Sequence, residues 1–157
     1  MKTTSIGFIG LGNVGKKLAN NLINKKNKIF LYDKNPKTYF YFKNKNVFLC
    51  KNFKDLVINS NIIITCLPSP VVVNNVINSL IPHISSSHLW IEMSTTDKDE
   101  MIRLSKIFNK KGGSVLECPI TGGEHRATSG NISILDEGER KVFNRAFPVL
   151  SKMGHQI

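Results

Sequence analysis

The chain has 157 residues, of which 41% are hydrophobic and 21% are charged, a composition typical of one globular domain. No apolar run approaches the roughly 18 residues that span a bilayer, and the N-terminus lacks a signal-peptide pattern, so we expect a cytoplasmic protein with no membrane partner. The net charge of +11 raises nucleic acid as a partner. The lysines, however, are spread through asparagine-rich stretches and form no recognisable module, so no nucleic acid is expected. Three cysteines and four histidines show no metal-ligand spacing, and we predict no metal site.

The first predicted unit is a buried strand over residues 5–9, a glycine-rich turn and a helix. Gly10, Gly12 and Gly15 stand in G-x-G-x-x-G order, and apolar residues then recur at helical spacing from Asn13 onward. In such a turn the first glycine makes the tight bend and the second lets the backbone approach a pyrophosphate. The third lets helix and strand pack closely. The pattern predicts a phosphate-binding turn.

A second strand, over residues 28–32, ends at Asp33, about 20 residues beyond the glycine turn, where a carboxylate can accept hydrogen bonds from the hydroxyls of an adenosine ribose. The strand, helix and strand together fit a βαβ unit. A structural turn followed by a solvated surface aspartate is the alternative interpretation.

The remaining pattern alternates between strands and helices. Thr96 is the predicted cap of a helix that starts near Asp97, with Asp99 in an acidic variant of the capping box, and Pro148 is expected to kink or divide the last helix. This alternation predicts an α/β fold with a Rossmann-type, doubly wound, mainly parallel sheet in a single domain. The predicted strands are 47–49, 61–66, 88–92, 114–117 and 131–135, and the predicted helices are 36–42, 53–59, 71–80, 97–111 and 137–153, with 154–157 as the start of a further strand.

Four strand ends carry unusual residues: the glycine turn, Asp33, Leu67-Pro68 and Ser94-Thr95. In open α/β sheets, ligands bind in the crevice at the carboxyl ends of the strands, so we expect these residues at one site. If Thr96 caps the following helix, Ser94 and Thr95 remain available at this edge. Adjacent glycines after the strand 114–117 can hold a carboxylate through backbone N–H groups, although an ordinary loop has the same pattern.

Four stretches in this order resemble the motif set of the β-hydroxyacid dehydrogenases. The most similar branch is 3-hydroxyisobutyrate dehydrogenase, and the wider group includes the NAD(P)-binding domain of 6-phosphogluconate dehydrogenase and the semialdehyde reductases. The resemblance covers essentially the whole chain. The four stretches are residues 7–15, Cys66-Leu67-Pro68-Ser69, Glu92-Met93-Ser94-Thr95 and Cys118-Pro119-Ile120-Thr121-Gly122-Gly123.

The resemblance implies an oxidoreductase that transfers a hydride between a nicotinamide cofactor and a small β-hydroxyacid or semialdehyde. Asp33 would hold the adenosine ribose and favours NAD, because a carboxylate repels a 2′-phosphate; Lys34 keeps NADP as the second candidate. The other implied cofactor contacts are Gly10, Leu11, Gly12, Asn13 and Val14 at the pyrophosphate, Leu67, Pro68 and Val72 at its flank and Thr95 at the nicotinamide. Ser94, Thr121, Gly122 and Gly123 would bind the carboxylate of the substrate.

Two departures from the family pattern limit this expectation. Glu124-His125-Arg126 replaces a small residue after the double glycine, and it either contacts an anionic substrate or lies on the surface. The family's catalytic lysine belongs to a helix beyond residue 157, which opens an all-helical catalytic and dimerisation domain. We therefore expect residues 1–157 to form the dinucleotide-binding domain only, and to bind cofactor without turnover. A separately encoded catalytic domain or a homo-oligomer would complete it.

Two alternatives remain open at this point. One is a dinucleotide-binding sensor or interaction module without catalysis. The other, less favoured, is a basic nucleic-acid-binding protein on a similar scaffold.

Overall fold

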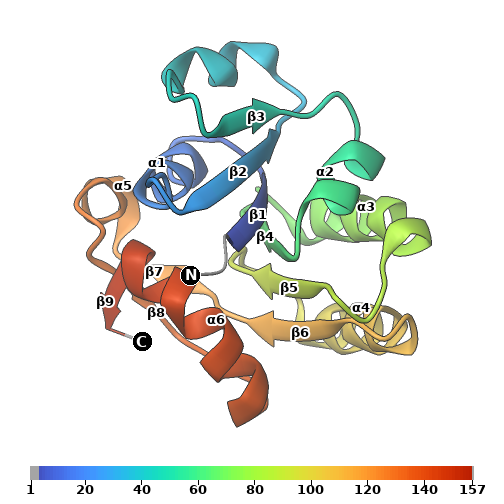
Figure 1. The fold of residues 1–157 in the computed structure, drawn as a ribbon. Coiled ribbons are helices and arrows are strands. Elements are labelled where there is room, and N and C mark those ends of the chain that lie inside the picture. Colours follow the sequence, from blue (N-terminus) through green and yellow to red (C-terminus); the bar gives the residue numbers. More distant parts are fainter. Residues whose placement is uncertain (1–3, 157) are drawn as a thin grey trace.

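The computed structural model describes residues 4–156, and its central feature is a six-stranded parallel sheet (Figure 1). The strands lie in the order β3-β2-β1-β4-β5-β6, which is the order of the doubly wound Rossmann fold. The predicted fold class is therefore confirmed. The strands are β1 (Thr4–Ile9), β2 (Asn27–Tyr32), β3 (Val47–Leu49), β4 (Ile62–Thr65), β5 (Leu89–Glu92) and β6 (Ser114–Glu117).

Helices cover both faces of this sheet and create two separate hydrophobic cores. Ile62 and Ile64 of β4 point into the core formed with α1 and α6, whereas Ile63 points into the core formed with α2, α3 and α4. No helix in the described part of the chain is long and apolar enough to cross a bilayer. The helices are α1 (Gly15–Asn21), η1 (Pro36–Tyr41), α2 (Phe53–Asn59), α3 (Pro70–Leu80), η2 (Ile81–His83), α4 (Lys98–Lys110), α5 (Gly123–Thr128) and α6 (Arg140–Met153).

A second, three-stranded sheet follows β6. The predicted strand over 131–135 forms as β8 (Ile132–Ile134), but it lies in this small sheet and not in the main one. It pairs antiparallel with β7 (Ile120–Thr121) and parallel with β9 (Gly154–Gln156). The sequence did not predict β7 or α5, because elements of two and six residues carry too little periodicity to be recognised.

The cap of α4 differs from the prediction. Asp97, and not Thr96, is the N-cap, and its Oδ1 accepts hydrogen bonds from the N–H groups of Asp99 at 3.1 Å and Glu100 at 3.2 Å. The carboxylate is the stronger acceptor and also favours the positive end of the helix, so the helix begins one residue later. The Thr96 hydroxyl is buried and makes no hydrogen bond within the described residues.

The last helix also begins later than predicted, at Arg140. Glu137 is not available for helix formation because its backbone forms an antiparallel bridge with Glu117 at the end of β6. Pro148 lies within α6 and does not divide it. Ala146 and Leu150, both fully buried, hold the helix against the sheet on either side of the proline.

Candidate functional site

A cavity of about 680 Å³ lies at the carboxyl ends of β1, β2, β4 and β5. The sheet order reverses direction between β1 and β4, and such a switch point is where open α/β sheets bind ligands. The cavity brings together nine of the residues predicted from the sequence, namely Gly10, Gly12, Val14, Asp33, Leu67, Pro68, Val72, Ser94 and Thr95.

The glycine turn shows a separate physical reason for each glycine. Gly10 has a φ of +96°, and a Cβ there would overlap the carbonyl oxygen of Cys66. A Cβ on Gly15 would likewise overlap the carbonyl oxygen of Gly10. A Cβ on Gly12 would meet nothing within 4 Å, although Gly12 lines the cavity. Gly10 and Gly15 are therefore required by the fold, whereas Gly12 leaves open space beside the backbone that a ligand can occupy.

Asp33 connects the end of β2 to the glycine turn. Its Oδ2 accepts a hydrogen bond of 2.7 Å from the N–H of Leu11, and its Oδ1 accepts one of 2.7 Å from the N–H of Asn35. The Tyr39 hydroxyl contacts both the N–H and the carbonyl of Asp33, at 3.0 and 3.1 Å. Because each carboxylate oxygen accepts more than one hydrogen bond, the fixed side chain can still accept bonds from hydroxyls in the cavity.

Tyr39 belongs to the aromatic run for which the sequence favoured core or edge packing. The run forms the 3₁₀-helix η1, capped by Asn35, and Tyr39 is half-buried. Burial raises the pKa of the Tyr39 hydroxyl, so this group stays protonated and keeps its contacts with Asp33 at neutral pH.

The ends of β4 and β5 are joined by buried hydrogen bonds, in which Ser94 takes part. Ser94 is only 5% exposed, and its hydroxyl accepts a 2.7 Å hydrogen bond from the N–H of Leu67. Its own N–H donates to Oε1 of Glu92 at 2.6 Å. Thr95, in contrast, is exposed and lines the cavity. Both residues line the cavity, and Thr95 is the more exposed of the two.

Five predicted residues lie outside the cavity lining. Leu11 is fully buried and contributes only its N–H, which Asp33 accepts, and Asn13 is exposed beside the turn. Thr121, Gly122 and Gly123 are exposed at the end of β7, one residue beyond Ile120, which does line the cavity.

The helix α5, which follows the exposed double-glycine turn, is tied to α1. Glu124, in the first turn of α5, forms a 2.6 Å ion pair with Lys17 of α1. Asn21 of α1 also donates a 2.8 Å hydrogen bond to the carbonyl of Ala127. These contacts hold α5, which follows the double-glycine turn, against α1, which follows the glycine-rich turn.

Sequence reasoning missed part of the cavity wall. Tyr32 and Phe53 line it with ring centroids 4.4 Å apart, and Lys34 and Thr38 line it near Asp33. Tyr32 could have been found from the sequence, because it is the last residue of β2 and directly precedes Asp33. The contact of its ring with Phe53 could not, because it depends on how α2 packs against the sheet. Cys66 also lines the cavity, and burial, followed by the nearby Glu92, raises the pKa of its thiol to about 12. It is therefore protonated at neutral pH and is a poor nucleophile.

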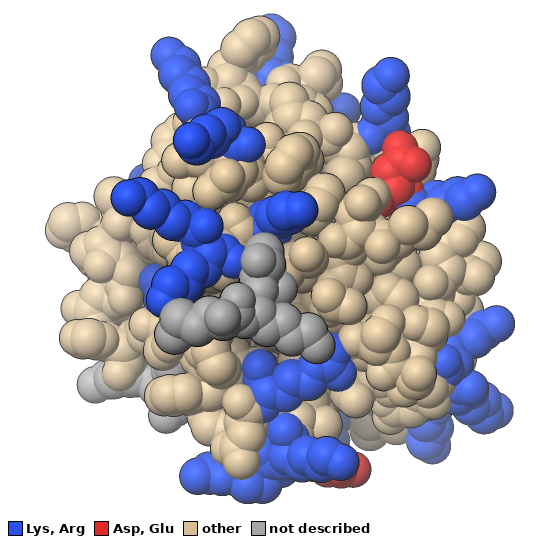
Figure 2. Space-filling view, viewed as in Figure 1, with Lys and Arg blue, Asp and Glu red and all other residues tan. Residues whose placement is uncertain are grey.

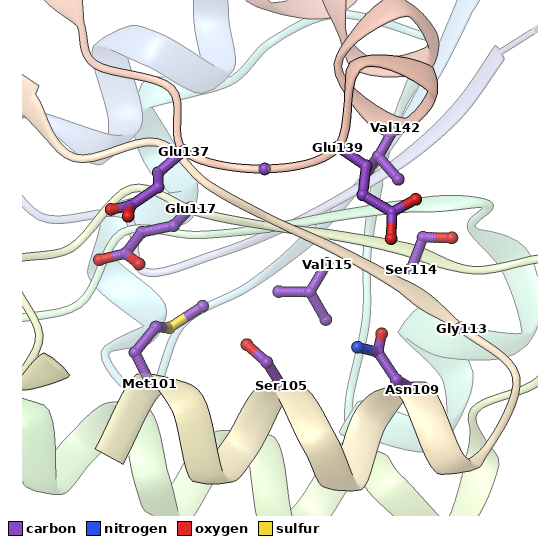
Figure 3. A pocket seen from close by; sticks show the side chains of 11 residues that line it. Met101, Ser105, Asn109, Gly113, Ser114, Val115, Glu117, Glu137, Glu139 and Val142 are labelled. Atoms are coloured by element: carbon purple, nitrogen blue, oxygen red, sulfur yellow. The ribbon is translucent and has the colours of Figure 1, made fainter. Parts of the chain in front are cut away.

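A second cavity, of about 500 Å³, lies beside the edge strand β6 and contains none of the predicted site residues. Ser105 and Asn109 project into it from α4, with Glu117 and Glu137 on one side and Glu139 on the other (Figure 3). Burial, and then the charge of Glu137, raises the pKa of Glu117. This acidic cavity shares no lining residue with the larger one.

The net positive charge of the chain comes from its N-terminal third, residues 1–54. Residues 1–54 contain twelve lysines and a single acidic residue, Asp33, whereas residues 55–157 contain ten basic and ten acidic residues. In Figure 2, Lys and Arg side chains lie over most of this face, including the region of β2 and η1, and few acidic side chains are visible there. The part of the sequence that carries Asp33 and the glycine turn therefore holds the net positive charge of the chain, and positive charge of this kind attracts anionic ligands.

The strand order, the glycine turn and a carboxylate after β2, all at one cavity, define a Rossmann-type dinucleotide-binding domain. A family model described as the NAD binding domain of 6-phosphogluconate dehydrogenase matches residues 5–157. The chain belongs to this family.

Curated relatives and solved structures agree with this assignment. The chain is 28% identical to 2-(hydroxymethyl)glutarate dehydrogenase of Eubacterium barkeri, over 99% of this chain and 53% of that protein. It is 32% identical to the mitochondrial 3-hydroxyisobutyrate dehydrogenase of Rattus norvegicus, over 98% of this chain and 47% of that protein. The 3-hydroxyisobutyrate dehydrogenase of Mycobacterium tuberculosis with L-serine has the same fold, with a TM-score of 0.90 and 24% identity over 99% of this chain and 53% of that one. The chain spans about half the length of the curated relatives it matches.

Proposed function

We propose that the chain binds NAD in the cavity at the carboxyl ends of β1, β2, β4 and β5, as the cofactor-binding part of a hydroxyacid dehydrogenase. The open space beside Gly12, in the same cavity as the Asp33 carboxylate, carries this proposal. The pyrophosphate would lie against the backbone of the glycine turn, and the ribose hydroxyls would donate to Asp33. The positive field of residues 1–54 supports the approach of a dianionic ligand.

NAD is favoured over NADP because of the charge on Asp33. A 2′-phosphate would place a dianion next to a carboxylate that is already held in position by Leu11 and Asn35. Lys34 and Thr38 line the same part of the cavity and offer a phosphate some compensation, so NADP is the second candidate.

For the substrate we propose a small β-hydroxyacid or semialdehyde, which would bind between Thr95 and the turn of Thr121, Gly122 and Gly123. The names of the relatives support this class. Bound NAD would accept the hydride from the hydroxyl-bearing carbon. Ser94 would also contact the carboxylate of the substrate, because its hydroxyl accepts the N–H of Leu67 and keeps its own donor.

Removing the charge of Asp33 tests the cofactor assignment. We expect Asp33→Asn to weaken NADH binding and to shift the ratio of NADPH to NADH affinity toward NADPH by on the order of tenfold, because the 2′-phosphate is no longer repelled. Fluorescence titrations with both cofactors measure the ratio, which general damage to the fold would not change. Asp136→Asn, an exposed change outside the cavity, is the matched control. An unchanged ratio would contradict the ribose assignment.

We further propose that the chain alone binds cofactor without turnover. Proton transfer from the substrate hydroxyl needs a positioned acid or base, which typically contributes 10²–10⁴-fold. A domain outside residues 1–157 or a second subunit would supply it. With saturating NAD and 3-hydroxyisobutyrate, we expect no NADH formation above background in an absorbance assay. Turnover by the chain alone would refute this part of the proposal.

The same experiments separate the remaining alternatives. NADH binding that no added partner converts into turnover would favour a sensor or interaction module. Strong salt-dependent binding of DNA or RNA without NADH binding would favour a nucleic-acid-binding protein. The cytoplasmic location stays a prediction, which fractionation of cells that express the chain would check.

A further inference from the structure

We infer that Glu92 is a positioning residue, which fixes the Leu67 turn and the Ser94-Thr95 turn at the nicotinamide end of the cavity. The inference rests on the proposed cofactor binding. Asp33 follows β2, the glycine turn follows β1, and the two turns in question follow β4 and β5. A dinucleotide that places its adenosine ribose at Asp33 and its pyrophosphate at the glycine turn would therefore extend its nicotinamide toward β4 and β5.

Glu92 is joined to both turns by a continuous series of short hydrogen bonds. Its Oε1 accepts the N–H of Ser94 at 2.6 Å, and the Ser94 hydroxyl accepts the N–H of Leu67 at 2.7 Å. Its Oε2 accepts the hydroxyl of Thr65 at 2.6 Å, and Thr65 in turn accepts the indole N–H of Trp90 at 2.8 Å. Each oxygen of the carboxylate thus has a donor, and the two turns are linked to each other through Ser94.

The network is also sealed from solvent. Glu92, Thr65 and Trp90 are fully buried and Ser94 is nearly so. A buried carboxylate without a basic partner is costly, and a hydrocarbon side chain would fill the same space at less cost. The carboxylate offers what a hydrocarbon does not, namely two acceptors that hold a backbone N–H and a hydroxyl in one orientation. Leu67 and Thr95, which this arrangement orients, both line the cavity.

Glu92 is not the partner of a basic group in an ion pair among the described residues. The nearest titratable groups are Glu117, its register neighbour on β6, and Cys66, which follows β4. Both are acidic groups, and neither forms an ion pair with it. Burial raises the pKa of Glu92 to about 7, while the hydrogen bonds from Ser94 and Thr65 act in the opposite direction. The donors are therefore arranged for the ionised carboxylate.

Two ligands that share the adenosine end distinguish positioning from general stability. ADP-ribose lacks the nicotinamide, whereas NADH carries it. We expect Glu92→Gln to raise the dissociation constant of NADH about tenfold, because glutamine has one acceptor for two donors, and to change that of ADP-ribose less than about twofold. Ser94→Ala, which removes the acceptor for Leu67, should show the same pattern. Isothermal titration calorimetry measures both ligands, and circular dichroism checks that each variant is folded.

Glu117→Gln is the matched control, since it changes the neighbouring buried-edge carboxylate outside the network, and neither ligand should be affected. If Glu92→Gln and Ser94→Ala raised the dissociation constants of NADH and ADP-ribose equally, the network would only stabilise the fold, and the inference would be overturned. Unchanged NADH affinity in both variants would overturn it as well. If the unchanged chain failed to bind ADP-ribose, the proposed function itself would fail, a result that is distinguishable from the other two.

Discussion

Gly12→Ala is expected to leave the fold intact and to weaken NADH binding by at least about tenfold, which corresponds to about 1.4 kcal/mol of binding free energy. The added methyl group meets no protein atom within 4 Å, and the backbone of Gly12 is not in the left-handed region that disfavours alanine. It would instead occupy the space where the proposed pyrophosphate approaches the turn. Titration of NADH fluorescence, together with thermal unfolding followed by circular dichroism, measures the two effects.

Gly15→Ala is the contrasting variant. Its methyl group would overlap the carbonyl oxygen of Gly10, a backbone atom that has little freedom to move. We expect a loss of about 1–3 kcal/mol in the free energy of unfolding, as for an overpacked core site. If Gly12→Ala bound NADH as tightly as the unchanged chain, the pyrophosphate would not lie at this turn. If Gly12→Ala lost as much unfolding free energy as Gly15→Ala, the fold itself would require glycine at position 12.

The sequence was sufficient to predict the main sheet and the glycine turn, Asp33, Leu67-Pro68 and Ser94-Thr95 in the cavity, because these depend on local patterns. Continuous β-branched runs such as residues 62–65 identify central strands covered on both faces. The glycine spacing and Asp33 follow directly from strand ends, and their meeting follows from the rule that parallel strands share a carboxyl edge. No knowledge of side-chain packing was needed for these steps.

The features that were missed depend on contacts between distant residues or on a shift of one residue. The hydrogen bond to the Ser94 hydroxyl was not expected, because nothing in the neighbourhood of Ser94 shows that Leu67, 27 residues away, donates to it. Thr96 and Asp97 are both good capping residues, and only the local backbone decides between them. Glu137 was assigned to a helix because its bridge to Glu117 is not visible in the periodicity.

Glu92 is also expected to make the stability of the chain depend on pH between about 4.5 and 7. Its pKa is 4.5 for an ordinary glutamate and about 7 in the folded chain, where burial is the main cause. The folded state therefore holds a proton in this range that the unfolded state has lost. Stability linked to Glu92 is complete below the lower pKa and is lost as the pH rises through the higher one, by about 3 kcal/mol in total.

Glu92→Gln isolates this effect, because glutamine is a neutral group of the same shape that does not titrate. We expect the difference in unfolding free energy between Glu92→Gln and the unchanged chain to rise in favour of the variant by about 3 kcal/mol from pH 4.5 to pH 7.5. Urea unfolding at several pH values measures it. The pKa of Glu117 is also raised, by burial and by Glu137, and contributes with the same sign. Glu117 is present in both proteins, so only its charge interaction with Glu92 enters the difference.

A constant difference across this range would mean that Glu92 keeps one protonation state throughout. A carboxylate ionised at every pH would show that the donors Ser94 and Thr65 offset the cost of burial completely. The positioning of the two turns would then not vary with pH. A rising difference would instead show that the same proton which stabilises the fold removes one acceptor from the network, so that NADH affinity and folding stability change in opposite directions as the pH falls below about 7.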